Sequence, residues 1–262
     1  MDSIYSLHTI RDVKPGDHIA WLYEVEQRHR SILTPFLRQG LEEGEKVLYI
    51  VDPQTARTIL DYLRDAGLDV GPYLSSRQLA ILTCDETYLR EGVFDPEGMI
   101  TFLQTETERA LAEGYTALRS SSEMTWALLG LPGCQRLMEY EARLNQFVPG
   151  SKCLVACQYD RRRFGPKVLL DVLRTHPLSV VGTVLYDDFI SEDTAENTTQ
   201  CARGFSCLYG EGQPLCKVEY AVGDEVVFVE SIDGPCSYWM PFGSASVCNC
   251  PTRREIYNRY RL

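Results

Sequence analysis

The strongest constraint on the fold is a regular alternation of short apolar runs with longer segments whose apolar residues recur at helical spacing. The apolar runs lie at 18–23, 46–52, 78–83, 115–124, 152–160 and 178–186. Runs that are apolar on both faces are typical of parallel strands buried between two layers of helices. We therefore predict an α/β domain with a mostly parallel sheet over residues 1–190, with helices near 32–41, 59–68, 94–114, 137–147 and 166–175.

The sequence pattern changes after residue 190. Residues 191–200 are polar and lack periodicity, so we predict a linker there. The segment 217–230 predicts two strands joined by a turn at Gly223 and Asp224. Six of the ten cysteines fall within 201–262, where we predict a small β-rich cysteine module whose core needs an additional cross-link or metal.

The clustered cysteines of this module indicate metal ligation. Zinc, the expected metal, takes four ligands in a tetrahedral arrangement and stabilises small domains that lack a large core. Because no pair of cysteines is separated by two residues, an iron–sulfur cluster and redox-active or free thiols remain open alternatives. The candidate metal ligands are Cys201, Cys207, Cys216, Cys236, Cys248 and Cys250.

Polar and aromatic residues gather where the predicted strands end. Ligands of open parallel sheets bind beyond the carboxyl ends of the strands, and convergent polar groups beside aromatic rings are typical of a small-molecule pocket. We expect Trp126 and Tyr159 to supply apolar contact, and Arg119 with Glu123 to orient a polar group. The complete set of expected ligand-binding residues is Tyr23, Glu24, Arg119, Glu123, Trp126, Gln158, Tyr159 and His176.

Several of these residues also have a structural interpretation. Ser121 or Ser122 could cap a helix that starts near Glu123. Arg119 could form an ion pair with Glu123, and His176, which precedes a proline, could hold a turn. These alternatives stay open at the level of sequence.

The sequence lacks the motifs of nucleotide binding and of common hydrolytic catalysis. Neither a glycine-rich phosphate loop nor a dinucleotide fingerprint follows the first predicted strand, where the chain runs EVEQRHRS. We therefore expect no nucleotide cofactor and a non-catalytic protein. The alternatives are a thiol- or metal-dependent redox enzyme that uses the C-terminal cysteines and a scaffold that binds no ligand.

The charge of the chain limits the classes of partner that it can bind. The 26 Lys and Arg residues against 37 Asp and Glu residues give a net charge of −11, which disfavours binding to nucleic acid or to an anionic membrane. No apolar stretch approaches the roughly 18–20 residues of a membrane helix, and the N-terminus lacks the features of a signal peptide. We expect a soluble, cytoplasmic protein that contacts neither nucleic acid nor membrane directly.

Several blocks of sequence occur in the order typical of one known family. They are HIAWLYE, PFLRQGLEEGEKVLYIVD, LDYLRDAGLDV, TYLREGVFDPEGMI, ERALAEGYTALRSSSEMTWAL, MEYEARLN, ACQYDRRRF and LRTHP, within residues 5–190. Together they resemble the MEDS domain, a sensory domain named for methanogens, methylotrophs and the regulator DcmR. The resemblance implies a RecA- or KaiC-like three-layer fold that has lost its nucleotide-binding loop and that senses small organic ligands such as hydrocarbon derivatives.

The chain also departs from that family's DNA-binding regulator. The sequence contains no helix-turn-helix candidate before residue 18 and no kinase segment. The resemblance therefore implies that the signal passes through a protein partner, a homo-oligomer or the cysteine module.

Overall fold

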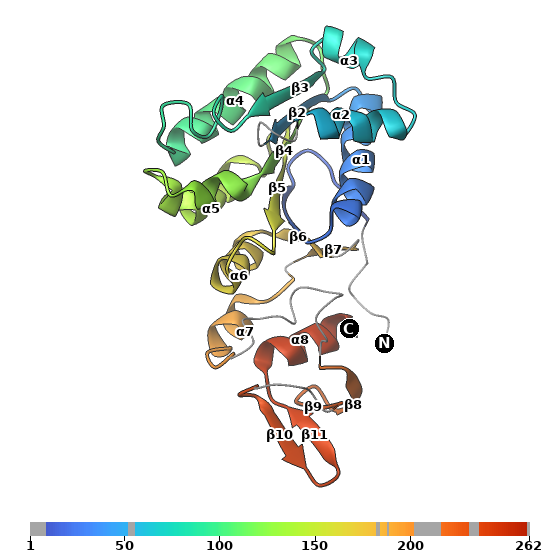
Figure 1. The fold of residues 1–262 in the computed structure, drawn as a ribbon, viewed down its shortest axis with the longest axis vertical. Coiled ribbons are helices and arrows are strands. Elements are labelled where there is room, and N and C mark those ends of the chain that lie inside the picture. The colour runs from blue at the N-terminus through green and yellow to red at the C-terminus, as the bar shows by residue number, and fades with distance from the viewer. Residues whose placement is uncertain are drawn as a thin grey trace.

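The computed structural model describes residues 9–51, 56–181, 184–187, 189–201, 216–230 and 236–260, which contain two sheets (Figure 1). The larger sheet has seven strands in the order β3-β2-β4-β5-β1-β6-β7. These strands are β1 (His18–Tyr23), β2 (Lys46–Val51), β3 (Leu79–Thr83), β4 (Leu118–Glu123), β5 (Cys153–Asp160), β6 (Leu178–Val181) and β7 (Val184–Asp187). All neighbouring pairs are parallel except β6 with β7, so the predicted mostly parallel sheet is confirmed.

Helices cover both faces of this sheet and give the predicted three-layer α/β fold (Figure 1). One face carries α1 (Glu26–Glu42) and α2 (Ala56–Asp65), and the other carries α4 (Pro96–Ala112), α5 (Leu137–Phe147) and α6 (Pro166–Thr175). The short helix α3 (Gly71–Ser75) precedes β3, and the 3-10 helices η1 (Met124–Leu129) and η2 (Cys134–Arg136) follow β4. Each face has its own apolar core, because successive strand residues point to opposite sides.

Local sequence signals explain where α4 begins and ends. The Asp95 side chain accepts a hydrogen bond from the backbone N–H of Gly98 at 3.0 Å, and Pro96 occupies a first-turn position where no N–H is required. Gly114 follows the helix with a φ of 92°, a conformation that favours glycine. None of the described helices is both long and apolar enough to cross a membrane.

The smaller sheet is antiparallel, with the order β10-β11-β9-β8. It contains β8 (Val218–Val222), β9 (Val226–Val229), β10 (Trp239–Phe242) and β11 (Ala245–Cys248), and α8 (Pro251–Tyr260) follows it. Gly223, with a φ of 60°, lies in the turn between β8 and β9, as the sequence predicts. The buried residues of this small core are Cys216, Val227, Val229, Cys248 and Cys250.

The helix α8 attaches the smaller sheet to the larger domain (Figure 1). Ile256 is buried and belongs to the same apolar core as Phe189 and Ile190. The backbone N–H of Ser191 donates to Glu255 Oε1 at 2.9 Å. The C-terminal helix is therefore part of the packing of both modules.

Two local predictions from the sequence are wrong. Residues 178–186 do not form one strand, because β6 and β7 pair with each other in antiparallel fashion. The predicted linker at 191–200 contains a helix, α7 (Glu192–Asn197), which packs against α8. The hydroxyls of Thr198 and Thr252 lie 2.8 Å apart at this contact. A polar segment without periodicity is thus helical because of its tertiary contacts.

Candidate functional site

A pocket of about 370 Å³ lies at the carboxyl ends of β1, β4 and β5, on the face that α1 and α2 cover. We call it the strand-end pocket. Because these three strands are parallel neighbours, their last residues, Tyr23, Glu123 and Asp160, meet at one edge of the sheet. The lining residues are Tyr23, Glu26, His29, Thr58, Ile59, Tyr62, Glu123, Thr125, Asp160, Arg162 and Arg163.

A chain of buried hydrogen bonds forms the floor of the strand-end pocket. Gln158 lies beneath it, and the Gln158 Nε2 donates to Ser121 Oγ at 2.6 Å. This orientation leaves the Gln158 Oε1 to accept a hydrogen bond from His29 Nε2. Tyr49 donates its hydroxyl to Glu123 Oε1 at 3.0 Å. These bonds hold His29 and Glu123 in fixed positions.

Burial sets the protonation of the groups around the pocket. Burial raises the pKa of Tyr23 and of Tyr49, and the charge of Glu123 raises both further, so both phenols remain neutral donors. Burial also lowers the pKa of His29, against the opposing effect of its hydrogen bond to Gln158. The pocket therefore combines neutral phenol and imidazole groups with the charged side chains of its lining.

Aromatic and charged side chains form the walls. The rings of Tyr23 and His29 lie 4.3 Å apart between centroids. The Asp160 carboxylate accepts hydrogen bonds from Arg162 at 2.7 and 2.9 Å. Arg163, which is exposed at the rim, has no ion-pair partner within the part of the chain that the structure describes. An aromatic wall beside charged groups suits a small molecule that has both an apolar and a polar part.

Three of the predicted ligand-binding residues gather at this site. Tyr23 and Glu123 line the strand-end pocket, and Gln158 lies directly beneath its floor. Glu24 follows β1 but is not part of the lining, and its carboxylate pairs with Arg161. The placement of Tyr23 and Glu123 follows from the parallel strands that end together.

Arg119 does not face the strand-end pocket. It is fully buried near the start of β4, where its Nε donates to Glu45 and its Nη1 donates to the carbonyl of Phe36 at 3.2 Å. Glu123 follows four residues later, which is about 13 Å along a strand, so the two residues do not form the predicted pair. The serines between them are buried within the strand and do not cap a helix.

Trp126, Tyr159 and His176 lie on the opposite face of the sheet. Trp126 packs against neighbouring aromatic rings, with the ring of Tyr88 stacked at 4.5 Å. Tyr159 follows Gln158 in β5 and therefore points the other way. Its hydroxyl donates to Glu141 of α5, and His176 also lies beside Glu141.

His29, Asp160 and Arg162 line the strand-end pocket but are not in the set of ligand-binding residues expected from the sequence. His29 lies one turn after Glu26 in the first part of α1, and both line the strand-end pocket. A sequence pattern could have identified both residues. Polar residues three positions apart at the start of a helix lie on the same face of it, and this helix directly follows a strand whose carboxyl end forms the pocket. Asp160 and Arg162 are the polar residues at the end of β5 and just after it.

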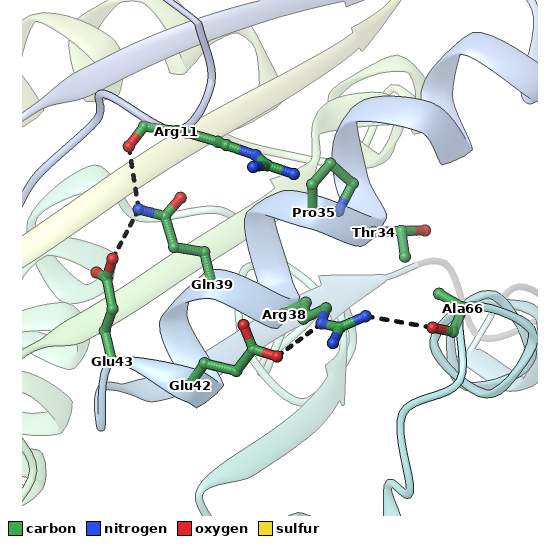
Figure 2. A pocket seen from close by; sticks show the side chains of 8 residues that line it. All are labelled: Arg11, Thr34, Pro35, Arg38, Gln39, Glu42, Glu43 and Ala66. Carbon is green, nitrogen blue, oxygen red and sulfur yellow. Dashed lines mark hydrogen bonds and ion pairs between the residues drawn. The ribbon is translucent and has the colours of Figure 1, made fainter.

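A larger hollow, of about 660 Å³, lies beside the C-terminal half of α1 (Figure 2). Its lining residues are Arg11, Thr34, Pro35, Arg38, Gln39, Glu42, Glu43 and Ala66. Arg38 Nε donates to Glu42 at 2.7 Å, and Gln39 Nε2 donates to Glu43 at 2.9 Å (Figure 2). Because Arg38, Glu42 and Glu43 already have partners, this hollow offers a ligand few available charged groups.

A third hollow, of about 480 Å³, is mainly apolar and lies among η1, η2 and the residues around the start of α6. Leu128 and Leu131 line it and are both partly exposed. Among the described residues of its lining there is no side chain of Asp, Glu, Lys, Arg or His. This apolar hollow is a second possible binding place against which the strand-end pocket has to be tested.

The described cysteines of the C-terminal module lie in and around its small core. Cys216, Cys248 and Cys250 are buried, Cys201 and Cys236 are half-buried, and none is in a disulfide. A hydrogen bond with Cys216, together with burial, raises the pKa of Cys248, and burial raises the pKa of Cys250 to about 11. Cys207 lies outside the described residues, and zinc binding by this module stays a prediction.

Among the residues that the structure describes, three or more metal-ligating side chains come together in only one group. All the ligand atoms of this group lie within 4.8 Å of one another. This group lies in the larger domain, between the sheet and the helices α5 and α6, and we call it the buried cluster. It consists of His18, Glu141, Cys157 and His176.

The fold and the strand-end pocket define an α/β protein with a pocket at the carboxyl edge of a mostly parallel sheet. Residues 17–177 match the family MEDS, described as the MEthanogen/methylotroph, DcmR Sensory domain. The chain belongs to this family, as the sequence blocks predict.

The chain is also similar to the transcriptional repressor DcmR of Methylorubrum extorquens (strain DSM 6343 / CIP 106787 / DM4), with 28% identity over 167 residues. The match covers 63% of this chain and 60% of that protein. The chain therefore matches less than two thirds of the length of this curated relative. The family and the relative together support a regulatory, sensory role.

Two solved structures from the archaeon Pyrococcus horikoshii OT3 are similar at a greater distance. A KaiC-like protein has 15% identity and a TM-score of 0.43, and the match covers 63% of this chain and 70% of that one. A second protein has 11% identity and a TM-score of 0.42, with coverage of 64% and 82%.

Proposed function

We propose that this protein is a non-catalytic cytoplasmic sensor that binds a small organic molecule in the strand-end pocket and signals through a protein partner. The observation that carries the proposal is the convergence of Tyr23, Glu123 and Asp160 from three parallel strands on one pocket. A pocket of about 370 Å³ is within the size range of small-molecule sites. Membership of a sensory family supports a role in detection.

The ligand that fits this pocket best is a small hydrocarbon derivative with one polar group. The ring of Tyr23 and the side chain of Ile59 provide apolar contact. Glu123 can accept a hydrogen bond from a hydroxyl or an ammonium group, and Arg163 can bind an acceptor at the rim. The side chains thus favour a molecule that is apolar at one end and hydrogen-bonding at the other.

The output of the sensor differs in our proposal from that of its relative. DcmR of Methylorubrum extorquens is a transcriptional repressor, and this chain matches 60% of its length. The net charge of −11 disfavours direct contact with DNA, so we place a protein partner or a second copy of the chain between ligand binding and the response. Zinc held by the C-terminal cysteines would stabilise the small sheet for that contact.

Ligand-observed NMR with saturation transfer tests the binding site. The probes are short alcohols, amines, carboxylic acids and chlorinated hydrocarbons, each added to the full chain. We expect signals from at least one of these classes with the wild type, and loss of those signals in Glu123→Gln and Tyr23→Ala. A matched control, Leu131→Ala, alters the apolar hollow and leaves the strand-end pocket intact.

The same experiment can reject the proposal. Loss of binding in Leu131→Ala with unchanged binding in Glu123→Gln would assign the ligand to the apolar hollow. A wild-type protein that binds no member of the panel would favour a scaffold over a sensor. Circular dichroism of each variant checks that the fold is retained.

A further inference from the structure

The buried cluster places four potential metal ligands on four different elements of the larger domain. His18 begins β1, Cys157 lies in β5, Glu141 lies in α5 and His176 follows α6. All four side chains are fully buried. The sequence predicts His176 as a ligand-binding residue of the pocket, and that prediction does not explain why these four side chains meet.

Hydrogen bonds fix the orientation of both imidazole rings. The amide of Asn145 donates from Nδ2 to the carbonyl of Thr175, so its Oδ1 faces His18 Nδ1 at 2.7 Å and accepts from it. His176 Nδ1 donates to the carbonyl of Val172 at 2.8 Å, because a carbonyl can only accept. The second ring nitrogen of each histidine, Nε2, therefore points into the cluster.

Both Nε2 atoms approach the same carboxylate oxygen. Glu141 Oε2 lies 3.1 Å from His18 Nε2 and 3.2 Å from His176 Nε2. The other oxygen, Oε1, already accepts a hydrogen bond from Tyr159. His176 Nε2 is buried and has no hydrogen bond of acceptable geometry within the described residues.

Protons alone satisfy this arrangement poorly. A neutral imidazole that has its hydrogen on Nδ1 presents a lone pair at Nε2, and a lone pair facing a carboxylate is repulsive. Two protonated imidazoles beside one carboxylate would leave a net positive charge in a site that water does not reach, which is costly. One protonated and one neutral imidazole balance the charge of Glu141, but the Nε2 lone pair of the neutral ring still faces the carboxylate.

We propose that His18, Glu141, Cys157 and His176 form a four-ligand Zn²⁺ site. Two neutral imidazoles, one carboxylate and one thiolate balance the charge of a divalent cation. These are the ligand types that zinc uses, and the outer hydrogen bonds from each Nδ1 are typical of metal-bound histidines. Binding releases the thiol proton of Cys157 to solvent as the sulfur–metal bond forms.

The distances within the buried cluster fit this coordination. Ligands at the usual zinc bond lengths of about 2.0–2.3 Å form a tetrahedron with edges of about 3.3 Å between N or O atoms and about 3.6 Å to sulfur. Cys157 Sγ lies 3.4 Å from Glu141 Oε2 and 3.7 Å from His18 Nε2. These two edges and the two from Glu141 to the histidines, four of the six edges, match a tetrahedral site within a few tenths of an ångström. The other two, from His176 Nε2 to His18 Nε2 and to Cys157 Sγ, are within 4.8 Å.

The four protein ligands leave no position for a substrate, which is typical of structural zinc sites. The metal would join β1 and β5 to the helices α5 and α6 that cover them. This role is separate from the strand-end pocket, which lies on the other face of the sheet, and from any zinc in the C-terminal module.

Zinc stoichiometry of the full chain tests the proposal. Protein loaded with Zn²⁺ and freed of excess metal is assayed by mass spectrometry for zinc per chain. We expect Cys157→Ala to hold one zinc fewer than the wild type. Cys153→Ala, a change at an equally buried thiol in the same strand, should leave the count unchanged, and Cys248→Ala reports separately on the C-terminal module.

Zinc-edge X-ray absorption of the wild type gives a second readout that does not depend on whether Cys157→Ala folds. Imidazole nitrogens in the zinc sphere are expected, because the C-terminal cysteines can supply only sulfur. A wild type that holds no zinc, a folded Cys157→Ala with an unchanged zinc count, or a sphere of sulfur alone would each overturn the proposal.

Discussion

The strand-end pocket and the buried cluster lie on opposite faces of the same two strands. β1 provides Tyr23 to the pocket and His18 to the cluster, and β5 provides Asp160 to the pocket and Cys157 to the cluster. The two sites differ in access, since the pocket opens at the edge of the sheet and the cluster is closed by α5 and α6. Strand alternation thus separates a site that a solute can reach from a site that is closed to solvent.

This difference in access determines what each site contributes to stability. Polar groups of the open pocket can bind water when no ligand is present, so Arg163 costs little stability although it has no ion-pair partner among the described residues. The polar atoms of the buried cluster have no such alternative, and each must be satisfied within the protein. Changes in the closed site should therefore affect folding, and changes in the open site should affect binding.

Glu141→Gln should give the largest loss of stability. The substitution removes the buried carboxylate that both Nε2 atoms face and that would bind the Zn²⁺, and removing one charged member of a buried ionic group costs about 3–5 kcal/mol. Urea denaturation followed by circular dichroism measures the loss. Glu139→Gln is the control on the same helix, because Glu139 forms exposed ion pairs with Arg136 and Arg143, and its change should be far smaller. Equal losses in both variants would contradict the contrast between closed and open sites.

Arg119→Met should be the next most destabilising change and should leave ligand binding intact. Its guanidinium is fully buried, donates to Glu45 and lies over the ring of Phe36 at 4.8 Å. Without it the Glu45 carboxylate loses its partner, which costs about 3 kcal/mol. Arg38→Met, which breaks an exposed pair, is the control. A retained stability together with lost binding of the NMR probes would restore Arg119 to the ligand site.

The sequence contained most of what was needed to predict the larger domain. Apolar runs gave the strands β1, β2, β3, β4 and β5 to within a few residues, and helical spacing gave α4. These features depend on local side-chain patterns, which periodicity reports directly. The split of β6 from β7 and the polar helix α7 depend on tertiary contacts, and no local pattern predicts them.

The candidate sites were harder to predict than the fold. Grouping residues by their place at strand ends brought Gln158 and Tyr159 together, although alternation sends them to opposite faces. The same grouping placed Arg119 after the end of a strand, but Arg119 lies near the start of β4. His18 and Glu141 are 123 positions apart, so only the assembled fold shows that they meet.

Glu255→Gln should weaken the docking of α8 in a pH-dependent way. Although burial raises the pKa of Glu255, hydrogen bonds from Thr194 and Ser191 and the contact with Arg259 outweigh it and lower the pKa below its usual value. Its stabilisation, about 1.5 kcal/mol, is present above the unfolded pKa of about 4.3 and is lost as the pH falls through the lower folded value.

Denaturation of wild type and Glu255→Gln from pH 7 to pH 3 measures this effect. The difference between the two should be constant near neutral pH and should shrink below about pH 4. Glu255 is largely buried, and with this outcome its contribution to the free energy of unfolding would lie between those of the closed and open sites. If the difference in stability between wild type and Glu255→Gln grows toward acid pH, the fold stabilises the protonated Glu255 side chain more than the ionised one.

Tyr49→Phe should have the smallest effect and should act at the boundary of the open site. The Tyr49 hydroxyl is buried beneath the strand-end pocket and lies 3.0 Å from Glu123 Oε1 and 3.4 Å from Gln158 Oε1. Its removal deletes one donor and costs about 1 kcal/mol of stability, because Glu123 can still bind water from the pocket. Urea denaturation measures this loss, and the NMR probes of the binding experiment should bind more weakly, since Glu123 is then less firmly oriented. A loss as large as that of Glu141→Gln would mean that water does not reach Glu123, and the pocket would then be as closed as the buried cluster.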